Sequence, residues 1–182
     1  MTPMMIMPVL RQVCRTPDGP WWRRVLGWCR AAVVYELAEN YEYPLPGGPT
    51  LILPAGFRSD LASTPRLSWL LGFRPDGMMT VPGLFHDFYY RHGHVLVASD
   101  AGFWAESMGD GSRAWGDALL LDLIRDITGL RLPAWAAWAA LRLFGGIAWR
   151  ANARHRRAAR KNNEWQLQGD YVDDHEDAEK TV

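Results

Sequence analysis

Two short stretches in the first sixty residues carry the hydrophobic pattern of β-strands. Residues 31–37 are β-branched and partly alternating, and residues 50–53 form a short apolar run. Side chains of this kind fit the pleated surface of a sheet. Because a turn rich in Pro and Gly at residues 44–49 separates the two stretches, we expect them to pair as an antiparallel hairpin.

Helical patterns dominate the rest of the chain. Pro82 suits the first turn of a helix, which we place at residues 82–91. Ser112 can cap a second helix. The apolar stripe of that second helix consists of Leu120, Leu121 and Ile124.

The most apolar stretch, residues 132–149, belongs to a third predicted helix, which begins at Pro133 and can continue to Lys161. One face of this helix carries Trp135, Trp138 and Leu141 or Arg142. The stretch contains an Arg and two Gly residues, and its apolar positions are Ala and Trp as much as Leu. We therefore expect a buried or interface helix rather than a membrane span.

These segments predict an α+β fold dominated by helices, in which three to four helices pack a small antiparallel sheet of two or three short strands. The length of 182 residues suits a single core. We expect the core domain at residues 31–149, after a Trp- and Arg-rich extension at residues 1–30. The charged C-terminal extension, residues 150–182, has a basic block at residues 150–161 followed by an acidic block at residues 170–179, a pattern typical of solvated or disordered segments.

The charge of the chain is balanced, with 20 Lys and Arg residues against 20 Asp and Glu residues. Composition therefore gives no strong signal for nucleic acid, and the apolar pattern gives none for a membrane. Cys14 and Cys29 lack the spacing of a zinc or redox motif. The first ten residues lack the basic start of a signal peptide, so we expect synthesis in a reducing cytoplasm.

Candidate chemistry begins in the most aromatic run of the chain. His86 and Tyr90 stand one turn apart on the same face of the predicted helix, and Asp87 follows the histidine directly. An acid next to an imidazole can orient the proton of the ring or hold a cation beside it. This run is therefore a candidate site.

Polar residues in two other segments can join this site. Asp117 lies on the apolar face of the second helix, where a carboxylate needs a partner. Arg113 and His86 are the two candidate partners. A rigid loop with Gly and two Pro residues precedes the aromatic run, and its polar residues are Asp60, Ser63 and Arg66.

In this order, the segments resemble a tailed-phage and prophage family catalogued as domain of unknown function 1353. The matching residues are Pro54-Ala55-Gly56-Phe57, Asp60-Leu61-Ala62-Ser63 with Pro65-Arg66, His86-Asp87 with Tyr90, Ser112-Arg113-Ala114 with Asp117, and Leu141-Arg142-Leu143-Phe144-Gly145. The resemblance covers about residues 33–149. It implies a phage or prophage source and a small α+β domain, and it brings no established activity.

The chain departs from the family pattern in its two extensions and in an insert at residues 92–111. Within this insert, residues 99–107 fit a short helix or a lid, and of the two we expect a packed surface helix. The insert puts in doubt whether a pocket of the family would be open in the same way here.

Two functions are compatible with these residues. In the first, His86, Asp117 and Arg113 form a buried network that ties the loop residues Asp60, Ser63 and Arg66 to the helices. The protein is then a structural or interaction component of a phage virion, associated with the tail, or of its morphogenesis. Its partners would be other phage structural proteins in a homo- or hetero-oligomer. We would expect it in the virion after synthesis in the host cytoplasm.

In the second, the protein is a hydrolase that acts on a lipid ester or on the cell wall. His86 would be the general base for water, Asp117 would orient its other ring nitrogen, and Asp87 would bind a divalent cation such as calcium. The sequence specifies no other cofactor.

The pattern His86-Asp87 with Tyr90 also resembles the active-site helix of secretory phospholipases. There the His activates water, the adjacent Asp holds calcium, and the Tyr and a distant Asp brace the His. By this resemblance Asp117 is the distant acid. This chain lacks the disulfide pairs that flank that motif, and it has no recognisable glycine-rich calcium loop.

Overall fold

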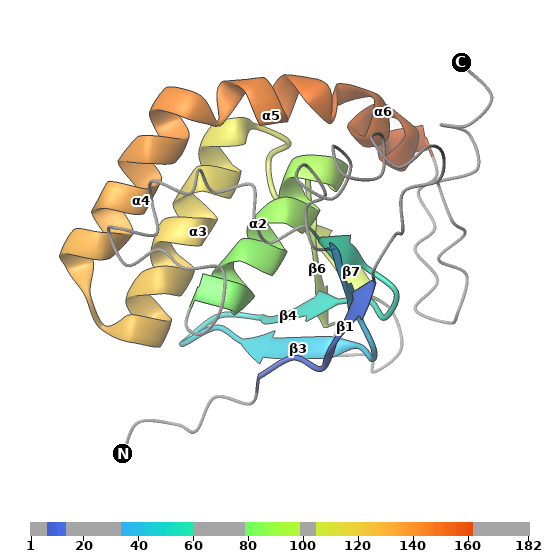
Figure 1. Ribbon diagram of the computed structural model, residues 1–182, viewed down its shortest axis with the longest axis horizontal. Coiled ribbons are helices and arrows are strands. Elements are labelled where there is room, and N and C mark those ends of the chain that lie inside the picture. Colours follow the sequence, from blue (N-terminus) through green and yellow to red (C-terminus); the bar gives the residue numbers. More distant parts are fainter. Residues whose placement is uncertain (1–6, 14–33, 60–78, 99–104, 162–182) are drawn as a thin grey trace, which may run out of the picture.

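The computed structural model describes residues 7–13, 34–59, 79–98 and 105–161. In this part of the chain, seven strands form two antiparallel sheets, beside five helices (Figure 1). The three-stranded sheet has the order β1 (Leu10–Val13), β2 (Val34–Leu37) and β5 (Arg58–Ser59). The four-stranded sheet has the order β3 (Tyr41–Pro44), β4 (Thr50–Leu53), β6 (Val95–Ala98) and β7 (Ala105–Met108).

The helices are α2 (Thr80–His92), α3 (Arg113–Thr128), α4 (Arg131–Phe144), α5 (Gly146–Ala151) and α6 (Ala153–Lys161). The first two predicted helices are present as α2 and α3, and the cap of α3 is the expected one, since the side chain of Ser112 accepts a hydrogen bond from the backbone N–H of Trp115. The third begins at Arg131 rather than Pro133, and it does not continue unbroken to Lys161 but is divided into α4, α5 and α6. The helix-dominated α+β class is therefore confirmed. The sheets contain more strands than the sequence predicted.

The predicted hairpin forms with a different partner. The turn rich in Pro and Gly joins β4 to β3, and Tyr41 lies opposite Leu53. β2 instead lies between β1 and β5. The prediction that residues 31–37 pair with residues 50–53 is therefore wrong. A bend after β2 starts the new strand β3, in which buried Tyr41 and Tyr43 alternate with exposed residues.

The insert adds strands to the larger sheet. β6 pairs with β4 on one side and with β7 on the other. The surface helix predicted at residues 99–107 is wrong for its described part, because β7 begins at Ala105. Val95, Leu96 and Val97 are all buried, so β6 occupies an interior position that needs a hydrogen-bonded neighbour along each edge.

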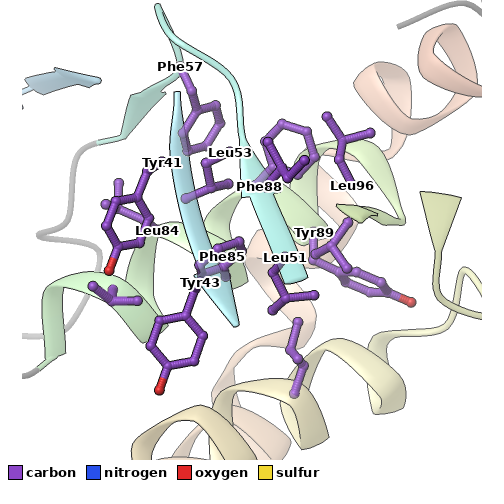
Figure 2. Close-up of a cluster of buried hydrophobic side chains, with 14 of the residues drawn as sticks. Tyr41, Tyr43, Leu51, Leu53, Phe57, Leu84, Phe85, Phe88, Tyr89 and Leu96 are labelled. Carbon is purple, nitrogen blue, oxygen red and sulfur yellow. The ribbon is translucent and has the colours of Figure 1, made fainter. Parts of the chain in front are cut away.

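The core is built around α2, which lies between the sheets and α3 (Figure 1). Ten of its thirteen residues are buried. Aromatic side chains from the strands and the adjoining loop meet those of the helix (Figure 2). The rings of Phe57 and Phe88, for example, pack edge to face with their centroids 5.2 Å apart. A helix buried on several sides is a rigid support for a polar site.

Two segments outside the predicted core domain contact it. Leu10 of β1 packs against the main hydrophobic cluster. In α6, Arg156 donates a hydrogen bond of 2.8 Å to the carbonyl oxygen of Tyr90, and its guanidinium lies 3.5 Å from the ring centroid of Trp149. Residues 153–161 are therefore helical, as the predicted continuation of the last helix to Lys161 allows, and Arg156 docks this helix on the core, whereas the charge pattern of the basic block had favoured a solvated or disordered segment. The acidic block lies outside the described residues.

α4 lies outermost, beside α3 (Figure 1). The one α4 side chain that is fully enclosed is Ala134, which packs with Leu120 and Ile124 of α3. The expectation of a buried helix therefore applies to one face only. None of the described helices combines the length and the apolar character needed to cross a membrane.

Candidate functional site

The structure brings His86, Tyr90 and Asp117 together between α2 and α3. Asp117 is fully buried, and its Oδ1 accepts a hydrogen bond of 2.5 Å from the hydroxyl of Tyr90. The Nε2 atom of His86 lies 3.5 Å from the same oxygen. His86 and Tyr90 are one turn apart, and their ring centroids are 4.0 Å apart. Both side chains therefore reach the carboxylate from one face of α2.

The other carboxylate oxygen faces two arginines. The Nη1 atom of Arg142, on α4, donates a hydrogen bond of 3.3 Å to Oδ2 of Asp117, and the Nε atom of Arg113 lies 3.8 Å from that oxygen. Arg113 also donates a hydrogen bond of 3.1 Å to the carbonyl oxygen of Arg142. These five residues, which we call the Asp117 network, join three helices: His86, Tyr90, Arg113, Asp117 and Arg142.

Gly145 lets the end of α4 approach the network. A Cβ atom at this position would lie 2.7 Å from the hydroxyl oxygen of Tyr90. Real Cβ atoms do not come this close, and the neighbouring ring is packed in the core. A side chain here would therefore push α4 away from α2.

Asp87 lies on the other side of His86. Its Oδ1 is 3.9 Å from Nδ1 of the imidazole, and its Oδ2 accepts a hydrogen bond of 2.5 Å from the hydroxyl of Ser59 on β5. His86 thus stands between two carboxylates. Its Nε2 atom has no hydrogen-bond partner among the described residues.

The electrostatics of His86 and Asp117 favour a charged pair. Burial by itself lowers the pKa of His86, but the carboxylates of Asp117 and Asp87 outweigh it, so the pKa lies above the ordinary 6.5. Burial by itself raises the pKa of Asp117, but the contacts with His86, Tyr90 and Arg142 outweigh it and hold the pKa below the ordinary 3.8. The imidazolium and the carboxylate therefore stabilise each other.

We expect a pH dependence of stability from this pair. The contribution of His86 is complete below pH 6.5 and is lost as the pH rises through its raised pKa. That of Asp117 is present above pH 3.8 and is lost as the pH falls through its lowered pKa. Between these limits both contributions are present. Urea unfolding at a series of pH values measures both slopes.

The variant His86→Gln isolates the alkaline slope. Wild type should lose up to about 1.4 kcal/mol per pH unit relative to the variant as His86 deprotonates. The comparison is needed because His92, whose pKa burial lowers to about 3, adds stability as the pH rises from about 3 to 6.5, where its effect meets the start of the His86 slope. His155→Gln, at an exposed position, serves as the control. Identical pH profiles of wild type and His86→Gln would contradict the raised pKa.

Some of the site residues predicted from the sequence lie outside the described residues, and two residues of the observed site were not predicted. Asp60, Ser63 and Arg66 lie outside the described residues. Sequence reasoning missed Ser59 as the partner of Asp87 and Arg142 as a partner of Asp117. The signal for Arg142 was its place in the segment that resembles the family. Ser59 gave no signal beyond a polar residue at the end of a short strand.

The arrangement is suited to bracing helices more than to admitting a substrate. His86 is only 7% exposed, and each member of the Asp117 network lies against at least one other member. Asp87 is the acid that we expected to hold a divalent cation. In the described ranges, no three His, Cys, Asp or Glu side chains are grouped so that they could hold a metal ion.

Comparison with known proteins identifies a family for the chain but no activity. The sequence profile of the family described as "Protein of unknown function (DUF1353)" matches residues 35–141. No curated protein and no solved structure matches the chain. The matched range contains four of the five members of the Asp117 network, and the fifth, Arg142, is the residue directly after it.

Proposed function

Since the chain belongs to the DUF1353 family of proteins of unknown function, we propose its role from the Asp117 network and from its sequence motifs. The protein is a structural or interaction component of a tailed-phage virion or of its assembly. The phage context rests on the resemblance described above. Within the particle we propose the tail as its location and other phage structural proteins as its partners.

The complete burial of Asp117 among three helices is the observation that carries this proposal. A buried carboxylate that is paired and hydrogen-bonded on both oxygens can specify one packing of its helices. A general base must instead reach water or substrate, and only 9% of the His86 side chain is exposed. The Asp117 network therefore fits a structural role, in which it fixes the relative positions of the three helices and so the shape of a binding surface.

A hydrolase is the second candidate, because His86 lies between two carboxylates. Because its Nε2 atom faces Asp117 at 3.5 Å, the nitrogen left to act as general base is Nδ1, once the imidazole has lost its extra proton. In this reading the substrate is a lipid ester or the cell wall, Asp117 orients the imidazole, Tyr90 braces it, and Asp87 holds a divalent cation such as calcium.

His86→Ala distinguishes the two functions. The variant replaces the gene copy in the phage or prophage that encodes the protein, and His155→Ala, at an exposed position, is the control. If His86 is part of a brace, the free energy of unfolding falls by about 1–3 kcal/mol, because Asp117 loses one partner. The amount of protein in purified particles and the infectivity should fall together with it.

Two other outcomes would count against the structural proposal. A His86→Ala variant that enters particles normally and melts like wild type, yet loses infectivity together with a lipid or peptidoglycan cleavage signal, supports the hydrolase. Wild-type protein that is absent from purified particles, in a phage that assembles normally without it, contradicts the structural proposal.

A further inference from the structure

The outward side of α4 is apolar and exposed. Leu132, Trp135 and Leu143 are 82%, 61% and 76% exposed. Because successive residues of a helix are about 100° apart, these three lie within one arc, which we call the outer face of α4. Phe144, at the end of the helix, and Ile147, in α5, are also exposed. The outer face is therefore a run of large apolar side chains in contact with water.

Rotation of α4 cannot remove this exposure, because the opposite side of the helix already packs against α3. Ala134 is fully buried, and Ala137 and Leu141 pack against the cluster that includes Leu120 and Ile124 of α3. Arg142 is tied to Asp117 on the same side. A helix that is apolar on both sides normally has a neighbour on both, and exposed apolar patches mark sites of interaction.

Positive charge borders the outer face. Arg131 and Arg142 directly precede Leu132 and Leu143, and a spacing of eleven residues, about three turns, puts both arginines along one edge. Both side chains are exposed. From residue 127 to residue 163 the chain has no Asp or Glu, and its basic residues are Arg131, Arg142, Arg150, Arg154, Arg156, Arg157, Arg160 and Lys161.

We propose that the outer face of α4 binds the surface of a membrane that contains anionic lipids. Leu and Trp side chains at the boundary of headgroups and acyl chains, with Arg beside the lipid phosphates, are the features of a helix that lies in the membrane plane. α4 has 14 residues and is packed along its inner side, so it would lie flat on the lipid. The bordering arginines select for negative headgroups.

A second copy of the chain fits this surface less well. In a symmetric dimer the same patch of each copy meets the other. Two outer faces that are each bordered by the exposed Arg131 and Arg142 would then meet and repel each other. An anionic lipid surface offers complementary charge over the same area. Arg142 is shared with the Asp117 network, but Leu132, Trp135, Leu143 and Arg131 are not, so the inference does not depend on the role of that network.

Sedimentation of the purified full-length chain with lipid vesicles tests the proposal. Wild type should bind vesicles of equal parts phosphatidylcholine and phosphatidylglycerol, and should bind vesicles of phosphatidylcholine alone much more weakly. The double variant Leu132→Ser with Leu143→Ser should lose at least about tenfold in partition, because two large apolar side chains no longer enter the lipid. Its melting temperature should stay that of wild type, since both side chains are exposed.

Two matched controls test whether binding depends on the outer face of α4, and not on exposed apolar area or net charge elsewhere in the chain. Val9→Ser removes an exposed apolar side chain from the residues before β1, and it should bind as wild type. Arg131→Gln should weaken binding to the anionic vesicles, whereas Arg11→Gln, which changes the net charge equally at an exposed position of β1, should not.

Three results would overturn the proposal. They are wild type that stays in solution with anionic vesicles, a double variant that binds as well as wild type, and a Val9→Ser variant that loses as much binding as the double variant. A wild-type dimer that does not bind vesicles, and that the double variant converts to monomers in light scattering, would assign the face to a second copy instead.

Discussion

Asp117→Ala should lower the free energy of unfolding by about 3–5 kcal/mol, the usual cost of removing one partner of a buried ionic network. The change leaves the Tyr90 hydroxyl without its acceptor and leaves His86 and Arg142 without the carboxylate they face. Three helices lose their common contact at once. Urea unfolding followed by circular dichroism near neutral pH measures the loss.

Asp122→Ala is the matched control. It makes the same replacement on the same helix, at a side chain that is 68% exposed and 3.8 Å from Arg125. We expect a change of less than about 0.5 kcal/mol, because surface ion pairs contribute little. Equal losses in the two variants would show that the Asp117 network is not what holds the helices together.

Gly116→Ala should destabilise the protein by about 1–3 kcal/mol, although Ala is the better residue in a helix interior. A Cβ atom at this position would lie 2.4 Å from Cδ1 of Tyr89. That ring is fully buried and stacks on Trp115 with a centroid distance of 4.8 Å. Since the ring has no space into which it can move, α3 must shift away from α2.

Ala114→Gly measures the helix propensity alone. Ala114 is an exposed residue in the first turn of α3, two positions earlier. The replacement should be destabilising because Gly is the poorer helix former, by less than the roughly 1 kcal/mol of a helix interior. Both variants should therefore be less stable than wild type, for opposite reasons. A Gly116→Ala protein that unfolds at a higher urea concentration than wild type would contradict the close approach of the two helices.

These two predictions concern the same interface. Gly116 sets how near α3 comes to α2, and Asp117, the next residue, places its carboxylate where the side chains of α2 can reach it. A shift of α3 would therefore also weaken the Asp117 network. We expect the two variants to be non-additive, as neighbouring sites generally are.

Local signals in the sequence were enough to place α2 and the start of α3, but not the breaks that divide the last predicted helix into α4, α5 and α6. Pro82 and the cap residue Ser112 mark helix starts, and the observed α2 extends beyond the predicted 82–91 by only two residues at the start and one at the end. The shared face of His86 and Tyr90 follows from a spacing of four residues. Asp117 was expected to need a partner because it interrupts an apolar stripe.

The tertiary structure alone decided which segments meet. Short strands with similar patterns can pair in several ways, so the partner of β2 could not be read from residues 34–37. The contact of Arg142 with Asp117 joins residues 25 positions apart, and the outer face of α4 became visible only once α3 had covered the inner one. Periodicity reports which side of a segment is apolar, because that depends on neighbours in sequence. What covers that side depends on contacts between distant residues, and these are fixed only when the chain packs.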